Sequence, residues 1–305
     1  MTKITNIKSI TALHQFLGIE KPKHPLVSVL RLNQVLRHFE IENFKYSLGL
    51  YQISLKENCP FVMVNYGRNS YDFQEATMIF TAPNQVVEYQ YQKAESTSAD
   101  EGWTLLFHPD LIRKADLGNK IDGYSFFDYS INEALHVSDE EKETVTEITS
   151  KIEKEFNNNI DAHSQTLIIS NLELLLNYAT RFYDRQFFTR TNFNKDIVTK
   201  FEHLLKTFYQ SEKPTEIGFP TVQYCGEALN VSPKYLSDLL RKETGRSTQD
   251  HIHQFVIDKA KTILLNSNKS VSEIAYKLGF EYPQYFSKMF KKKTTMSPTE
   301  FRSLN

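Results

Sequence analysis

The last third of the chain holds two short amphipathic segments separated by a glycine, and this stretch constrains the fold most. Residues 270–302 read SVSEIAYKLGFEYPQYFSKMFKKKTTMSPTEFR. A serine cap precedes Ile274, Ala275 and Leu278 at helical spacing, and Gly279 supplies the positive φ at which helices often end. A second helix follows. Two short helices joined by a turn are the arrangement that places one helix in a DNA major groove, although the same pattern also forms an ordinary corner of a helical core.

The second of these helices separates an apolar inner face from a polar outer face. Its outer face carries amide, hydroxyl and ammonium groups, which are the groups that reach base edges and phosphates in DNA complexes. The outer residues are Gln284, Ser287, Lys288 and Lys291, and the inner residues are Phe286, Met289 and Phe290.

A second copy of this organisation lies upstream, at residues 221–245. The first helix of this copy ends at Asn230, Ser232 is placed to cap the next helix, and Pro233 takes the first helical position, where its missing N–H costs nothing. Between the two copies, residues 251–266 have the pattern of one long helix. Two helix-turn-helix copies joined by a helix favour a DNA-binding role over a corner of a core.

Length and composition fit a globular protein of two domains. The chain has 305 residues, more than one ordinary domain usually holds, and 40% of them are hydrophobic. No run of ~18 apolar residues and no signal-peptide core is present, so we expect a soluble, cytoplasmic protein that has no contact with a membrane. Cys59 and Cys225 lie far apart in the sequence and indicate neither a disulfide framework nor a metal site.

Charge is distributed unevenly along the chain. Residues 195–305 contain 17 Lys and Arg and 12 Asp and Glu, a net of +5, whereas residues 1–194 contain 19 and 25, a net of −6. A basic second half favours an anionic partner such as nucleic acid.

Residues 26–108 are rich in β-formers, in short runs separated by turn-forming residues. Six short strands of this kind predict an antiparallel barrel or a sandwich, preceded by a short helix that ends at Gly18. The predicted strands are 27–30, 47–55, 61–66, 76–81, 85–91 and 103–107, and the predicted turns are 58–60, 67–70, 83–84 and 96–102.

Helical periodicity begins at Ser138, a cap followed by three acidic residues that favour the helix dipole. We predict one helix up to Phe156 and a second over 162–188. The apolar face of the second helix is wider than one partner helix needs, which predicts a homodimer through the helices in 139–188. The alternative is that the whole face is buried within one subunit.

The polar residues 189–195 mark a domain boundary. We therefore predict a first domain over residues 1–190 and a second over 191–305, which begins with a helix over 196–209 and a loop over 211–218.

Several motifs in the second domain occur together in one order. They are SPKYLSDLLRKETG at 232–245, residues 263–265, IAYKLGF at 274–280, YFSKMFKKKTTMSP at 285–298, and Glu300, Phe301 and Arg302. In these motifs, residues from about 221 to 302 resemble the C-terminal DNA-binding domain of AraC/XylS-type transcriptional regulators. The resemblance implies two recognition helices, near 233–243 and 283–292, which enter successive major-groove segments about one helical turn of DNA apart, ~34 Å. The first half resembles, with less specific motifs, the family's cupin-like regulatory barrel followed by dimerisation helices.

The resemblance also assigns DNA contacts. Glutamine contacts adenine and lysine reaches guanine, whereas Asp238 departs from the basic or amide side chains often found at its position. The base-facing residues would be Lys234, Ser237, Asp238 and Arg241 in the first copy and Pro283, Gln284, Ser287 and Lys288 in the second. The phosphate contacts, or else a solvated face, would be Lys291, Lys292, Lys293 and Arg302.

The sequence offers little support for enzyme chemistry. A cupin metalloenzyme needs a His-x-His pair and a carboxylate on neighbouring strands, and residues 1–194 contain no such pair. The one His-x-His, His251 and His253, falls on a predicted helix, where i and i+2 point apart. We therefore expect no enzyme activity, no metal and no cofactor.

These observations predict an α+β protein. It would have a cupin-like antiparallel barrel, two helices, and an all-α domain with two helix-turn-helix units. The predicted function is a DNA-binding transcriptional regulator whose first domain senses a small molecule or a partner and changes DNA engagement or contact with RNA polymerase. In the alternative, that domain binds no ligand and serves only in dimerisation or protein contact; a cupin-type enzyme is the remote alternative.

Overall fold

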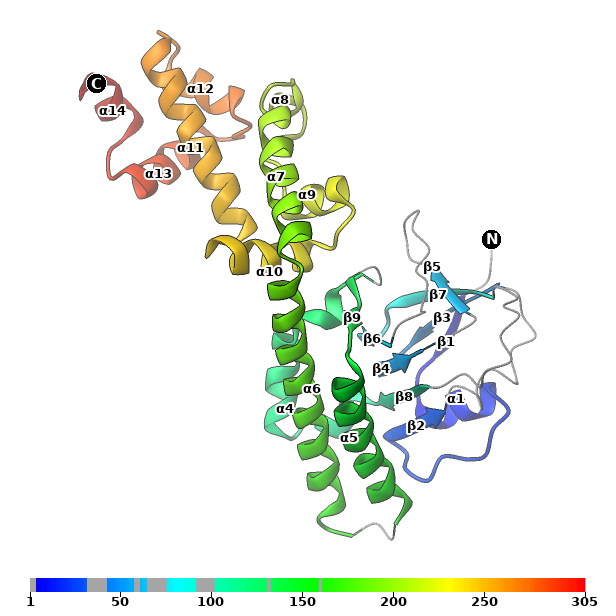
Figure 1. Cartoon of the computed structure of the whole chain (residues 1–305). Coiled ribbons are helices and arrows are strands. Elements are labelled where there is room, and N and C mark those ends of the chain that lie inside the picture. The colour runs from blue at the N-terminus through cyan, green and yellow to red at the C-terminus, as the bar shows by residue number, and fades with distance from the viewer. Residues whose placement is uncertain are drawn as a thin grey trace. The chain divides into compact units, whose positions relative to one another are not determined.

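The structure is a computed structural model that describes residues 4–31, 43–57, 61–64, 76–91, 102–130, 133–158 and 161–304. The chain divides into two compact units, Met1–Thr189 and Arg190–Asn305. The first unit contains the strands and the second is helical (Figure 1). The predicted turns 58–60, 67–70 and most of 96–102, and residues 65–66 of the third predicted strand, lie outside the described residues.

The strands of the first unit form two sheets. One sheet has the order β1-β3-β7-β5, with β1 and β3 parallel, and the other has the antiparallel order β2-β8-β4-β6-β9. The bounds are β1 Ile4–Ile7, β2 Val27–Arg31, β3 Asn43–Leu48, β4 Tyr51–Lys56, β5 Phe61–Val64, β6 Thr77–Thr81, β7 Val86–Tyr91, β8 Gly102–Phe107 and β9 Leu135–His136. Within the described residues the sheets are not closed into a barrel, so the predicted antiparallel barrel is wrong in its closure and in its wholly antiparallel pairing.

The predicted single strand 47–55 is also wrong, because the chain changes sheets within it. Strand β3 ends at Leu48 and β4 begins at Tyr51 in the other sheet. Gly49 lies at the crossing, where its N–H donates to the Ile7 carbonyl (2.8 Å) and a Cβ atom would lie 3.2 Å from the Cα of Lys8. The close approach of two backbones at Gly49 therefore interrupts a run that is otherwise rich in β-formers.

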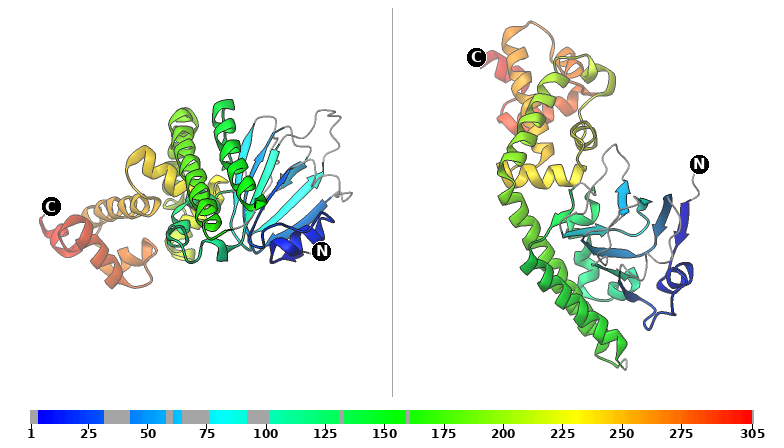
Figure 2. Two further views of the ribbon diagram at one scale, coloured as in Figure 1. Left: turned by 90° about the horizontal axis from the view of Figure 1, so that it is seen from below. Right: turned by 45° about the vertical axis from the view of Figure 1, so that its right-hand side comes forward.

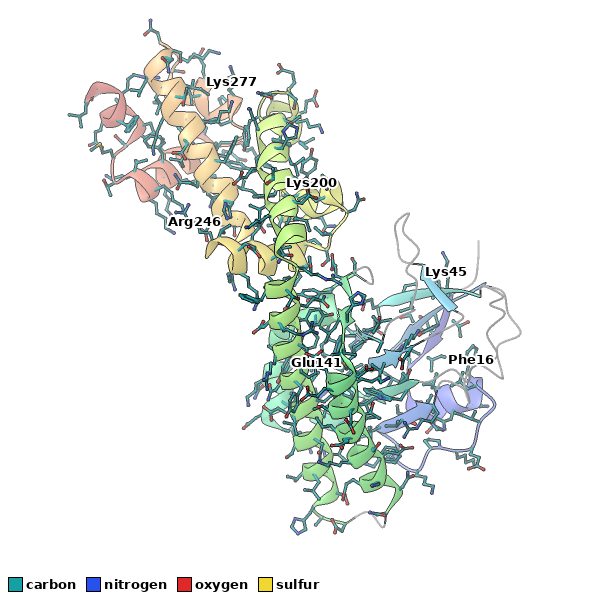
Figure 3. The ribbon with its side chains drawn as sticks, in the orientation of Figure 1. Phe16, Lys45, Glu141, Lys200, Arg246 and Lys277 are labelled. Atoms are coloured by element: carbon teal, nitrogen blue, oxygen red, sulfur yellow. The ribbon has the colours of Figure 1, made fainter. Side chains whose placement is uncertain are left out.

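One face of the five-stranded sheet packs against helices. Trp103 donates from Nε1 to the Thr146 hydroxyl of α5 (3.1 Å), and Arg31 forms an ion pair with Glu153 of the same helix. Figure 2 shows α5 and α6 together on one side of the strands. Figure 3 shows side chains filling the space between these helices and the strands. The helices of this unit are α1 Ile10–Phe16, α3 Pro109–Ile112, α4 Asp116–Lys120, α5 Asp139–Asn157 and α6 Ser164–Thr189, with 3₁₀ turns η1 Ile121–Gly123 and η2 Ser125–Asp128.

The other face of this sheet meets the four-stranded sheet, and part of it is polar. Gln52, Ser54 and Lys56 alternate along β4 and are all buried. Tyr46 of β3 donates from its hydroxyl to Gln52 Oε1 (3.3 Å), Gln52 donates to the Ser54 hydroxyl (3.0 Å), and that hydroxyl lies 3.0 Å from the hydroxyl of Thr104. We call these four linked residues, Tyr46, Gln52, Ser54 and Thr104, the polar row. Burial of polar groups in a small domain requires such hydrogen bonds.

Local capping explains the ends of the helices in the first unit. Ser138 caps α5 through a reciprocal capping box with Glu141, as the acidic residues after a serine predict. The predicted short helix is α1, which ends before Gly18 at a φ of 64°. Glu141 also accepts two guanidinium hydrogen bonds from Arg185 of α6 (2.8 Å each), so the cap of one helix ties the two long helices together.

The second unit contains eight described helices. They are α7 Thr191–Phe208, α8 Lys213–Ile217, α9 Val222–Leu229, α10 Pro233–Thr244, α11 Thr248–Asn266, α12 Val271–Lys277, α13 Pro283–Thr294 and α14 Pro298–Leu304. Two expectations fail here. The predicted loop 211–218 contains α8, and most of the polar stretch 189–195 belongs to α7. The side chain of Asn194 is buried and donates to Glu243 of α10 (2.9 Å), a tertiary contact that overrides its weak helix propensity.

The long helix α11 connects two small cores (Figure 1). In the first, α7 packs against α9 and α10, where Phe201, Cys225 and Leu236 are buried. In the second, the rings of Phe280, Phe286, Phe290 and Phe301 form a continuous series with centroids 5.2–5.7 Å apart. No helix within the described ranges is long and apolar enough to cross a membrane.

Candidate DNA-binding site

The first helix-turn-helix unit is built by caps at each end of its helices. Thr221 caps α9, which ends at Asn230 in the left-handed conformation (φ 56°). Ser232 then accepts the Tyr235 N–H and Pro233 opens α10. The turn is tight because Gly226 of α9 lies against it: a Cβ there would meet the Val231 carbonyl at 2.7 Å. The sequence therefore fixes α10 closely against α9.

The second helix-turn-helix unit has a cap on its first helix, a glycine after it and a proline at the start of its second helix. Ser270 caps α12 through a capping box with Glu273, and Gly279 (φ 90°) follows the helix. A Cβ at Gly279 would lie 2.8 Å from the Gly218 carbonyl carbon, so only glycine fits both the backbone conformation and the contact. Pro283 opens α13, as Pro233 opens α10.

The predicted base-facing residues of α10 lie on one face of that helix, at the spacing i, i+3, i+4 and i+7. Lys234 and Arg241 are exposed. Ser237 is half-buried, with its hydroxyl 3.1 Å from that of the buried Thr248. Asp238 is also half-buried and has an interaction within the protein. The surface of α10 therefore presents two cations, with a carboxylate between them.

The predicted base-facing residues of α13 lie at its N-terminal half. Gln284 and Lys288 are exposed and adjacent on the helix surface, whereas Pro283 and Ser287 are half-buried. The helix has four lysines and no carboxylate. Its exposed face is therefore more positive than that of α10, which suits a polyanion.

The four predicted phosphate contacts divide into two pairs. Lys291 and Lys292 are exposed to solvent. Lys293 lies with Nζ 3.4 Å from Asp250 of α11, and the Ser247 hydroxyl and then Lys293 hold the pKa of the Asp250 carboxyl below its usual value. Arg302 donates from Nε to the Leu264 carbonyl (3.1 Å) and from Nη2 to the Lys269 carbonyl (2.7 Å).

Sequence reasoning missed two exposed aromatic residues beside this face. Tyr285 in the first turn of α13 and its N-cap Tyr282 are both exposed, and their ring centroids are 5.8 Å apart in an edge-to-face arrangement. The spacing of Tyr285 from Lys288 and Lys292, i, i+3 and i+7, places all three on one face and was the available signal.

Cys225, His251 and His253 are the residues of this region that could be taken for reactive or metal-binding groups, and each is packed within the fold. Burial raises the pKa of the Cys225 thiol to about 11, which leaves it protonated and unreactive at neutral pH. His251 places Nε2 2.7 Å from the Thr244 hydroxyl, and the His253 ring lies edge-on to Phe219. In the described part of the chain, no three His, Cys, Asp or Glu residues are grouped as metal ligands would be.

Two helix-turn-helix units joined by one helix define the class of this region as a DNA-binding domain. Residues 225–303 match the family described as a helix-turn-helix domain.

Curated relatives match the same region. The chain is 33% identical over 82 residues to an uncharacterized HTH-type transcriptional regulator, YijO, of Escherichia coli, covering 27% of this chain and 29% of that protein. It is 36% identical over 92 residues to the uncharacterized transcriptional regulatory protein YesN of Bacillus subtilis, and this match covers 28% of this chain and 25% of that protein. It is 32% identical over 87 residues to the transcriptional activator RhaR of Escherichia coli, and this match covers 28% of this chain and 30% of that protein. The chain thus spans less than a third of the length of these relatives.

Solved structures give matches of low TM-score. The C-terminal domain of the two-component response regulator yesN of Fusobacterium nucleatum is 31% identical, with a TM-score of 0.29, and the match covers 33% of this chain and 96% of that one. ToxT of Vibrio cholerae is 16% identical, with a TM-score of 0.31, and the match covers 91% and 96%.

Proposed function

We propose that this chain is a DNA-binding transcriptional regulator that reads two adjacent major-groove segments with α10 and α13. The single observation that carries the proposal is the pair of helix-turn-helix units, each with a proline-initiated second helix, in a segment that matches the helix-turn-helix family. The exposed donors Lys234, Arg241, Gln284 and Lys288 support it, because amide and cationic side chains on a recognition helix are those that contact base edges. We assign Ser237, Asp238, Pro283 and Ser287 to the same two base-facing surfaces.

Selection of bound DNA from a genomic library with the purified full chain tests this proposal. The expected result is a recovered site with two conserved segments spaced by about one helical turn, 10–10.5 base pairs. Recovery of no preferred sequence at low or moderate salt would contradict it.

We further propose that the first unit, corresponding to residues 1–190, senses a small molecule. The polar row supports this, because small-molecule sites place a few polar groups among apolar ones to orient the ligand. Thermal melting against a metabolite library is the test, because a ligand that binds the native state raises the melting temperature. A shift that is lost in Ser54→Val supports sensing. No shift with any compound would favour the alternative of an assembly or protein-contact module.

We also propose a homodimer through α6. Most of its apolar face is buried within the chain, but Leu167 and Leu174, which lie two turns apart on one face, remain 47% and 43% exposed. Sedimentation at micromolar concentration should show a dimer for the native chain and for Thr166→Glu, an exposed position beside this stripe, and a monomer for Leu174→Glu. A native monomer would contradict the proposal.

A further inference from the structure

The two helix-turn-helix units repeat one another position by position, and the repeat exposes one difference. Helices α10 and α13 have the same length, begin with proline and end at a residue in the left-handed conformation. The third residue of each is a tyrosine. Tyr235 in α10 is 2% exposed, whereas Tyr285 in α13 is 65% exposed. The same residue type at the same position therefore has a core role in one unit and a surface position in the other.

The packing of the units differs around these tyrosines. In the first helix-turn-helix unit, α7 packs on both α9 and α10. Helix α13 packs against α11, α12 and α14, and its buried positions are Phe286 and Phe290. The ring of Tyr285 thus lies outside this core, where a large aromatic side chain gains no burial energy within the unit.

The ring of Tyr285 contacts an aromatic neighbour on the surface. Its ring lies edge-on to that of Tyr282, with centroids 5.8 Å apart. Glu281, which directly precedes Tyr282, raises the pKa of the Tyr282 hydroxyl. The Tyr285 ring therefore has a defined aromatic neighbour on one side, while the residue remains 65% exposed.

Tyr285 belongs to a stripe of donors along α13. Tyr285, Lys288 and Lys292 are spaced i, i+3 and i+7, so they lie on one face, next to the face of Gln284, Lys288 and Lys291. All of these side chains are exposed donors, and α13 has no carboxylate to oppose an anion.

The equivalent stripe of the first helix-turn-helix unit is partly buried. Its three positions are the buried Tyr235, the carboxylate Asp238 and Lys242. A partly buried stripe that carries one carboxylate and one lysine complements a phosphate backbone less well than the stripe of α13, which carries only donors.

We propose that the Tyr285 hydroxyl donates a hydrogen bond to a DNA phosphate at the edge of the groove that α13 enters. Together with Lys292, this hydroxyl gives the second helix-turn-helix unit an edge that faces the DNA backbone, which the first helix-turn-helix unit lacks. This inference rests on the proposed function, because it requires that α13 bind DNA.

The test is the affinity of the full-length Tyr285→Phe variant for the site recovered by DNA selection. Loss of a hydrogen bond to a charged group should weaken binding about tenfold, equally for all sequences. The salt dependence should not change, because a phenol releases no counterion, whereas Lys292→Gln should lower the slope of log K against log salt by about one. Tyr276→Phe, which removes an exposed hydroxyl from α12, is the matched control and should bind as the native chain does.

Replacement of single phosphates by neutral methylphosphonates locates the contact. One substituted phosphate should weaken binding of the native chain but cause no further loss in Tyr285→Phe. Native affinity of Tyr285→Phe, or losses that add independently at every phosphate, would overturn the inference. If Lys288→Ala weakens binding while Tyr285→Phe does not, the inference alone fails; if the native chain selects no DNA, the proposed function fails with it.

Discussion

At the scale of single residues, the end of α13 is strained where the end of α10 is not. Both helices end in the left-handed conformation, at Gly245 (φ 74°) and at Thr295 (φ 67°). A β-branched residue in this conformation costs about 1–2 kcal/mol, partly offset by the smaller entropy of its unfolded state. We expect Thr295→Gly to raise the stability of the second unit by about 1 kcal/mol.

Thermal unfolding followed by circular dichroism measures this change. Gly245→Ala is the matched control and should lower stability, since its Cβ would meet open space and only the backbone conformation opposes it. An equal or lower melting temperature for Thr295→Gly would show that the hydroxyl of Thr295, which donates to the Thr294 carbonyl (2.6 Å), outweighs the strain.

Two histidines of α11 make the helical half of the chain, Arg190–Asn305, sensitive to acid. Burial lowers the pKa of His251 and of His253 from 6.5, and in addition Arg246 lowers the first and Lys293 the second. The unfolded chain therefore takes up protons before the folded chain does. Their contribution to stability is complete above pH 6.5 and is lost as the pH falls through the two folded pKa values.

Urea unfolding at pH 7.5 and 5.5 measures this loss. The midpoint by circular dichroism should fall between the two pH values, and the fall should be smaller in the double variant His251→Gln, His253→Gln. The fluorescence of Trp103, the single tryptophan, reports the first unit and serves as the internal control. An identical fall in the native and double-variant chains would contradict this account.

At the scale of elements, Arg302 connects three of them. Its guanidinium on α14 binds the carbonyl of Leu264 in the last turn of α11 and that of Lys269, which directly precedes the cap of α12. The bond to Leu264 satisfies a carbonyl that the C-terminal end of α11 leaves open, and the bond to Lys269 fixes the loop before α12. We therefore expect Arg302→Lys to lower the melting temperature, because lysine does not provide two donors in a fixed planar geometry.

The sequence assignment of Arg302 to phosphate makes the opposite prediction for DNA binding. If Arg302 holds the turn between α11 and α12, Arg302→Ala should lower the melting temperature and weaken DNA binding without changing its salt slope. A native melting temperature with a salt slope lowered in Arg302→Ala would support the phosphate contact instead.

Periodicity and capping predicted most elements, and tertiary contacts account for the failures. The caps at Ser138 and Ser232 are local signals, and each begins a helix where predicted; of the two serines that could cap α12, Ser270 and Ser272, the structure uses Ser270. The break at Gly49 and the helical conformation around Asn194 depend on partners distant in sequence, Lys8 and Glu243. Neither contact can be inferred from local spacing. The predicted strand 47–55 is therefore too long, and the predicted helix 196–209 begins too late.

At the scale of the whole molecule, the two halves differ in how much their sequences reveal. The second half contains a repeated unit, and the repeat predicted both candidate recognition helices with their exposed donors. It did not predict which donors are engaged within the protein, such as Ser237 with Thr248, because this depends on burial. The first half has no repeat, and its sheet pairing, including the parallel pair of β1 and β3, depends on long-range register.

The central claim is that α13 reads DNA bases with one face and holds the backbone with another. DNA titrations of Lys288→Ala and Lys292→Ala test it most directly, on the selected site and on sites with single base changes, across a range of salt concentrations. We predict that Lys288→Ala loses discrimination at one base pair, by about 1–3 kcal/mol. Lys292→Ala should weaken all sequences alike and lower the salt slope by about one. Native affinity, discrimination and salt slope in both variants would contradict the claim.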